Sequence, residues 1–102
     1  MSSPDLASFE ETYARHVGLV QAGDVAGMLD DMAPGAAPAV FEGVVVPRGA
    51  VLGAEIRAVR VEGARGTGEC VYTLADGRIG LRSGWVHDGT AWKADALENF
   101  AV

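Results

Sequence analysis

The spacing of the apolar residues changes part-way along the chain, and this change constrains the fold more than any other feature of the sequence. Before about residue 38, apolar residues recur every three or four positions, which indicates amphipathic helices. From about residue 39, β-rich runs alternate with glycine-containing turns. A chain of 102 residues suits one domain, covering residues 1–102. We therefore predict an α+β domain in which two helices pack on one face of an antiparallel sheet.

Residues 3–22 are expected to form the first helix, with Ser3 as its cap and Pro4 in its first turn. One face of this helix carries residues at helical spacing, namely Leu6, Phe9, Tyr13, His16, Val17 and Val20. Gly23 supplies a left-handed stop, and Asp24 caps a short second helix. The apolar stripe of the second helix consists of Val25, Met28, Leu29 and Met32. The tight junction should bring the two helices into a compact corner.

The remainder of the chain predicts strands joined by hairpins. Residues 39–46 form a β-rich run in which Gly43 indicates a bulge or bend, whereas residues 47–56 fit either a helical turn or a strand. The alternation slips in phase at Ala58-Val59, and Asp76-Gly77 is typical of a hairpin turn. The next strand alternates cleanly, with one face made of Ile79, Leu81, Ser83, Trp85 and His87.

Composition and charge exclude several classes of partner. The net charge of -6 argues against nucleic acid and against anionic membranes, and it favours a neutral or cationic small molecule or another protein. The single cysteine, Cys70, cannot form an internal disulfide, and with two histidines it makes a closed zinc site improbable. The first residues lack a signal peptide pattern, and no apolar run could span a bilayer. We expect a cytoplasmic protein without metal or cofactor.

Two segments resemble a known family. The stretch "ETYARHVGLVQAGDVAGMLDDM" and the C-terminal strand "GTAWKADALENF" are similar to the nuclear transport factor 2-like superfamily. Within it, they most resemble small bacterial proteins related to ketosteroid isomerase and polyketide cyclases. The resemblance implies a cone-shaped α+β barrel, with N-terminal helices packed on a strongly curved sheet around a pocket. It also implies a homodimer through the outer sheet face. The family's third helix should be short or missing here, because only "PRGAVLGAEI" occupies its place.

The same resemblance implies a catalytic pair. In the isomerase-like members, a tyrosine on the first helix donates a hydrogen bond to a developing oxyanion, and Tyr13 lies at the matching place. A carboxylate after the first strand acts as the base, and Glu42 lies at or beside that position. Alternation places Glu42 opposite Phe41, so one of these two residues faces outward. Tyr13 could equally be a core residue bonded to a backbone carbonyl.

Other residues could line the predicted pocket. His16 lies one turn after Tyr13 and could shuttle protons, although such a histidine more often packs at a helix–sheet edge. We expect Trp92 in the core and Trp85 at the pocket wall, while His87 belongs at the pocket mouth or in solvent. Adaptable apolar walls would come from Met28, Met32 and Phe41.

These observations predict a protein that binds a small hydrophobic molecule. The expected activity is cofactor-free isomerisation, cyclisation or dehydration of a polyketide- or steroid-like carbonyl compound, by proton transfer α to the carbonyl. The alternative is a non-catalytic module that binds a ligand or mediates dimerisation. The two hypotheses differ in whether Tyr13 and Glu42 face one enclosed space.

Overall fold

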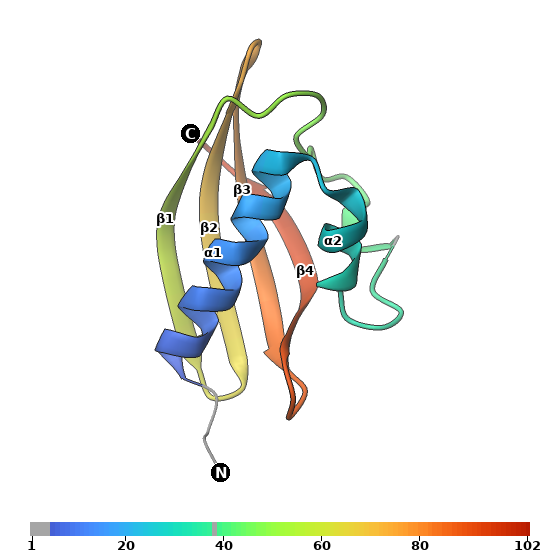
Figure 1. Cartoon of the computed structure of the whole chain (residues 1–102), viewed down its shortest axis with the longest axis vertical. Helices are drawn as coiled ribbons and strands as arrows, with labels where there is room; N and C mark the ends of the chain where they lie inside the picture. The colour runs from blue at the N-terminus through green and yellow to red at the C-terminus, as the bar shows by residue number, and fades with distance from the viewer. Residues whose placement is uncertain (1–4, 38) are drawn as a thin grey trace.

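The computed structural model, which describes residues 5–37 and 39–102, places two helices on one face of a four-stranded antiparallel sheet (Figure 1). This arrangement confirms the predicted α+β class. The helices and the 3-10 turn that follows them are α1 (Leu6–Ala22), α2 (Val25–Asp30) and η1 (Ala39–Phe41). The strands neighbour one another in chain order, as β1 (Gly53–Glu62), β2 (Arg65–Leu74), β3 (Gly77–His87) and β4 (Trp92–Phe100). None of the described helices is long and apolar enough to cross a membrane.

The two helices begin and end at residues with the expected capping chemistry. The Asp5 side chain caps α1 by accepting a hydrogen bond from the Ser8 backbone N–H at 2.9 Å. The predicted cap and first turn at Ser3 and Pro4 lie outside the described residues. Gly23 ends α1 with a left-handed φ of 71°. Asp24 caps α2 by accepting from the Gly27 N–H, so both predictions at this junction are confirmed.

Two aromatic rings of α1 lie directly on glycines of β2. A Cβ at Gly66 would come within 2.9 Å of the Phe9 ring, and a Cβ at Gly68 within 2.7 Å of the Tyr13 ring. The two aromatics are one helical turn apart and advance by about 6 Å, while the two glycines advance by about 6.6 Å along the strand. The nearly equal spacing lets both rings rest on bare backbone, which fixes how α1 lies across the sheet.

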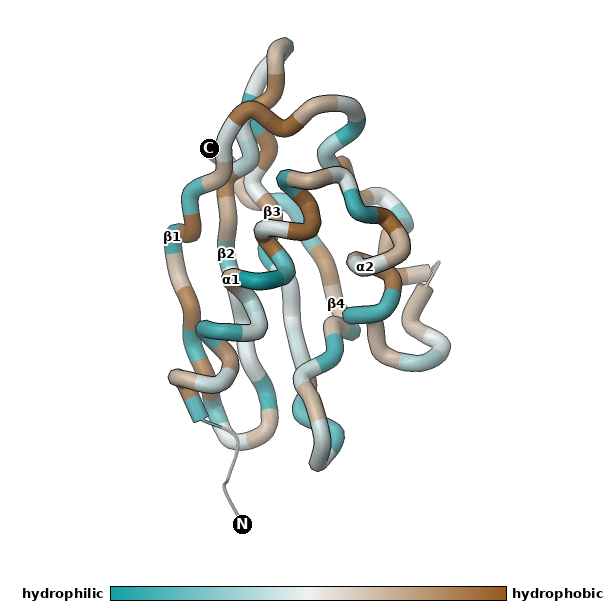
Figure 2. The backbone as a smooth tube through the Cα atoms, viewed as in Figure 1, coloured by the Kyte–Doolittle hydropathy of each residue, from teal (hydrophilic) through white to brown (hydrophobic). Residues whose placement is uncertain are grey.

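The hairpins follow the predicted pattern, with small shifts. The pairing of β1 with β2 is irregular between Ile56 and Ala58, next to the predicted phase slip. In the β2–β3 hairpin Leu74 pairs with Gly77, as the Asp76-Gly77 signal indicated. Along β3, the predicted inner face is confirmed, since the buried residues include Leu81, Ser83 and Trp85. In Figure 2, hydrophobic and hydrophilic residues alternate along β1.

The predicted strand over residues 39–46 is wrong. Its first part forms η1, and the chain then runs irregularly to Gly53. The backbone of Val45 bonds to a side chain instead of a neighbouring strand: its N–H donates to Asn99 Oδ1, and its carbonyl accepts from Asn99 Nδ2, each at 2.8 Å. A valine-rich run therefore stays extended without joining the sheet. Residues 47–52 contain no helix, in agreement with a short or missing third helix.

Candidate ligand-binding site

A cavity of about 470 Å³ lies between α1, α2, the segment 46–51 and the inner face of the sheet. This volume lies within the usual range for small-molecule sites. Most of its lining is apolar, contributed by Val20, Gly23, Val25, Met28, Leu29, Met32, Phe41, Val46, Pro47, Gly49, Val51, Leu81, Ala94 and Leu97. The polar or charged side chains among its lining residues are Tyr13, His16, Arg48, Tyr72 and Ser83. An apolar chamber with a few polar groups suits an uncharged or amphiphilic organic molecule.

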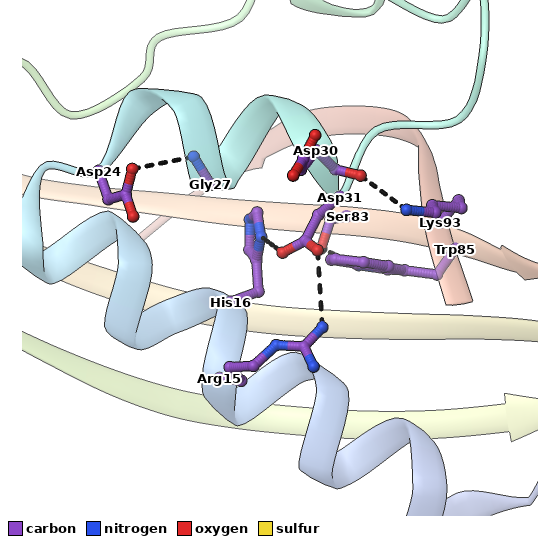
Figure 3. Close-up of polar contacts among 9 residues, drawn as sticks. All are labelled: Arg15, His16, Asp24, Gly27, Asp30, Asp31, Ser83, Trp85 and Lys93. Carbon is purple, nitrogen blue, oxygen red and sulfur yellow. Dashed lines mark hydrogen bonds and ion pairs between the residues drawn. The ribbon is translucent and has the colours of Figure 1, made fainter. Parts of the chain in front are cut away.

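A histidine and a buried aspartate are hydrogen-bonded beside this cavity. His16 Nδ1 lies 2.9 Å from Asp31 Oδ2, and Figure 3 shows His16 and Arg15 of α1 both directed toward Asp31. Arg15 Nη2 lies 3.6 Å from the other carboxylate oxygen, Oδ1. Asp31 is only 7% exposed, and its backbone carbonyl accepts from the Ala94 N–H of β4 at 2.7 Å. Asp31, the residue that ends α2, is thus bonded to α1 through its carboxylate and to β4 through its backbone carbonyl.

The aspartate determines which atom of His16 can exchange a proton with a ligand. Nδ1 is bonded to Asp31, so Nε2 is the ring nitrogen that remains for a ligand. His16 is one of the residues that line the cavity. The imidazole also packs edge-on against Trp85, with ring centroids 5.0 Å apart. A carboxylate behind a histidine fixes the ring orientation and stabilises the imidazolium that forms when Nε2 accepts a proton. His16 is therefore placed as a general acid or base.

Tyr13 supplies a hydrogen-bond donor in the same cavity. Burial raises the pKa of its phenol well above the ordinary value, an effect that the side-chain hydrogen bond with Ser83 partly offsets. Ser83 Oγ accepts from Trp85 Nε1 at 2.8 Å, so its own proton is available for Tyr13. The phenol therefore stays protonated at neutral pH and can donate to a ligand oxygen.

A second phenol, that of Tyr72, also lines the cavity and was not predicted as a site residue. Burial is the main cause that raises its pKa, and Cys70 and Tyr13 raise it further. The thiol of Cys70 is itself buried, which raises its pKa. The sequence carries a usable signal for Tyr72, because it follows Gly66 and Gly68 at even spacing and so shares their inward face.

The structure brings five of the predicted site residues to one cavity. These are Tyr13, His16, Met28, Met32 and Phe41. Besides Tyr72, sequence reasoning missed Asp31, which lies fifteen positions after His16, so no helical spacing signals the pair. Only the corner between α1 and α2 brings the two side chains together.

The remaining three predicted site residues do not line the cavity. Glu42 is exposed in the turn after η1, because Phe41 takes the inward place, so the predicted pairing of Glu42 with Tyr13 is wrong. Trp85 is fully buried among other rings and belongs to the core, as Trp92 does. His87 packs against Trp92 with ring centroids 5.1 Å apart, and its Nδ1 accepts from the N–H of Gly89 in the following turn.

Within residues 5–37 and 39–102, no three His, Cys, Asp or Glu side chains are grouped as a metal site requires. No protein-family model, curated protein or solved structure matches the chain significantly. The geometry of the cavity and of the His16–Asp31 pair therefore indicates what the protein can do.

Proposed function

We propose that this protein binds a small hydrophobic carbonyl compound in the cavity and transfers a proton α to the carbonyl without a cofactor. One observation carries the proposal: the imidazole of His16 is held by a buried carboxylate, with 2.9 Å between Nδ1 and Asp31 Oδ2, at the wall of an apolar cavity. The base is therefore His16, in place of the Glu42 that the family resemblance implied.

The proposed reaction uses three side chains. His16 Nε2 takes a proton from the carbon next to the carbonyl, and the electrons of that C–H bond move onto the carbonyl oxygen as an enolate. Asp31 stabilises the imidazolium, and the Tyr13 hydroxyl donates a hydrogen bond to the enolate oxygen. Return of the same proton to the γ carbon of a β,γ-unsaturated ketone moves the double bond into conjugation. In a β-hydroxy ketone, the imidazolium would instead give the proton to the β-hydroxyl, which leaves as water as the α,β double bond forms.

The arrangement of the elements supports the family resemblance as part of this proposal. We propose a cone-like fold related to the nuclear transport factor 2-like superfamily, because α1 and α2 meet in a corner against a long antiparallel sheet with a cavity between them. The outer sheet face supports a homodimer. At the centre of this face, Gly84 pairs with Ala96, so no large side chain projects there. Next to them, Arg82 donates hydrogen bonds to Glu69 Oε2 at 2.5 Å and to Glu98 Oε1 at 2.7 Å. Sedimentation equilibrium tests this association.

The test of the proposed reaction is the conversion of a β,γ-unsaturated cyclic ketone to its conjugated isomer, followed by ultraviolet absorbance. We expect His16→Gln to lower kcat by about 100-fold or more and Tyr13→Phe by about 100-fold, because general-base and oxyanion contributions have these sizes. Glu42→Gln serves as the matched control and should retain full activity. Wild-type protein that binds the ketone without converting it would contradict the proposal.

A non-catalytic ligand carrier is the second candidate. Two residues that line the cavity, Val25 and Leu29, are 61% and 49% exposed, so α2 leaves one side of the cavity open to solvent. Proton abstraction from carbon benefits from exclusion of water, whereas ligand binding alone does not require it. Binding of the ketone with no turnover, and with His16→Gln having no effect on affinity, would favour this second candidate.

A further inference from the structure

One basic side chain distinguishes the mouth of the cavity from its interior. Arg48 lines the cavity and is exposed to solvent, and no Asp or Glu is among the lining residues. At the interior wall, the titratable groups are the phenols of Tyr13 and Tyr72 and the imidazole of His16. Arg48 therefore supplies a fixed positive charge at the mouth, whereas the imidazole in the interior is already paired with the Asp31 carboxylate.

Arg48 has no ion pair with any other residue in the part of the chain that the structure describes, unlike several arginines of the sheet. Arg65, for example, donates to both carboxylate oxygens of Asp95, at 2.8 and 3.2 Å. In a chain of net charge -6, carboxylates are plentiful, yet no carboxylate of residues 5–37 and 39–102 forms an ion pair with the Arg48 guanidinium. This leaves its forked donors available for a ligand.

The position of Arg48 relative to His16 gives the shape of the ligand. The segment 46–51, which includes Arg48, lines the cavity and belongs to the connection that passes over the end of α1 in Figure 1. His16 and Gly23, the residue that ends α1, both line the cavity, and they are seven positions apart, which is about 10 Å along a helix. A ligand that contacts both ends is therefore elongated.

We propose that the ligand is an elongated apolar molecule with a carbonyl at the end near His16 and an anionic acid group at the other end, bound by Arg48. This inference rests on the proposed function and specifies its substrate class. It also differs from what the overall charge indicates, since a net charge of -6 favours neutral or cationic ligands. The charge nearest a bound ligand matters more than the net charge because salt screens exposed charges over about 10 Å, and the lining residues include Arg48 but no carboxylate.

Two fluorescent probes with the same ring system test the proposal. Anilinonaphthalene sulfonate carries an anionic group, and N-phenylnaphthylamine lacks it. We expect Arg48→Gln to weaken binding of the anionic probe about five- to tenfold and to leave binding of the neutral probe unchanged, because a charge-assisted hydrogen bond is lost. Arg78→Gln, on the outer sheet face, removes the same charge and should change neither affinity. A higher salt concentration should weaken binding of the anionic probe and leave binding of the neutral probe unchanged.

The outcomes separate this inference from the proposed function. Equal loss with Arg48→Gln and Arg78→Gln, or equal loss for both probes, would overturn the role of Arg48 while the cavity stays a ligand site. Failure of both probes to bind the wild-type protein would overturn the ligand site itself and this inference with it. Binding of the neutral probe alone would overturn only the anionic end of the ligand.

Discussion

His16 Nδ1 and Asp31 Oδ2 lie 2.9 Å apart, which joins the middle of α1 to the residue that ends α2. The backbone of Asp31 is also tied to the sheet, because its carbonyl accepts from the N–H of Ala94. One residue thus fixes the helical corner and orients the imidazole at the cavity. Structure and proposed chemistry depend on the same contact.

Replacing Asp31 by alanine should therefore destabilise the fold. We expect the free energy of unfolding to fall by about 1–3 kcal/mol, because a buried partner of His16 is lost. The neighbouring variant Asp30→Ala is the matched control, since Asp30 contributes its backbone carbonyl to Lys93 and its side chain is exposed. It should change stability by less than about 0.5 kcal/mol. Equal urea midpoints for the two variants would show that Asp31 has no structural role.

The two buried tyrosines predict loss of stability at alkaline pH. Burial raises the pKa of Tyr13 and Tyr72 above the ordinary 10.0, so in the folded protein both stay protonated where the unfolded chain ionises. Stability is then complete below about pH 10 and falls above it, by about 1.4 kcal/mol per pH unit for each tyrosine. Urea unfolding in this range measures the slope. Tyr72→Phe should reduce it, and an unchanged slope would contradict the burial of this phenol.

The contact between α1 and β2 predicts the effect of a single methyl group. Gly68→Ala would place a Cβ in steric overlap with the Tyr13 ring, and we expect it to cost about 1–3 kcal/mol. Gly53→Ala is the control, because its Cβ would meet nothing within 4 Å. Thermal unfolding compares the two variants. Equal stability would mean that the Tyr13 ring does not rest on the strand.

The side chain of Asn99 should control the irregular segment beside the cavity. It makes two hydrogen bonds with the Val45 backbone and a third with the Gly80 carbonyl, at 3.1 Å. We expect Asn99→Ala to lower stability by about 1–2 kcal/mol and to weaken binding of N-phenylnaphthylamine. Asn99→Asp keeps the acceptor but lacks the donor. If either variant bound the probe as tightly as wild type, the segment would not depend on this side chain.

Local chemistry made much of the fold predictable from sequence. Gly23 and Asp24 mark the junction of the helices because a left-handed stop and a side-chain cap are local signals. Asp76-Gly77 locates the central hairpin for the same reason. The segment 39–46 was mispredicted because strand formation requires a partner, and the partner of Val45 is a side chain 54 residues away.

The candidate site was predictable only in part. Helical spacing places Tyr13 and His16 on one inward stripe, and both line the cavity. Asp31 could not be found in this way, because its contact with His16 arises from the tertiary corner between the helices. Glu42 was mispredicted because its facing depended on a strand alternation that the chain does not adopt there.

The tautomer of His16, read from nitrogen chemical shifts in long-range proton–nitrogen NMR spectra, tests the central claim most directly. We expect neutral His16 to carry its proton on Nδ1, bonded to Asp31, and its Nε2 shift to move when N-phenylnaphthylamine binds. His87 serves as the internal reference and should not respond, because it lies outside the cavity. A proton on Nε2 in the wild-type protein, or a His16 signal that ligand leaves unchanged, would contradict a proton-transfer site at this pair.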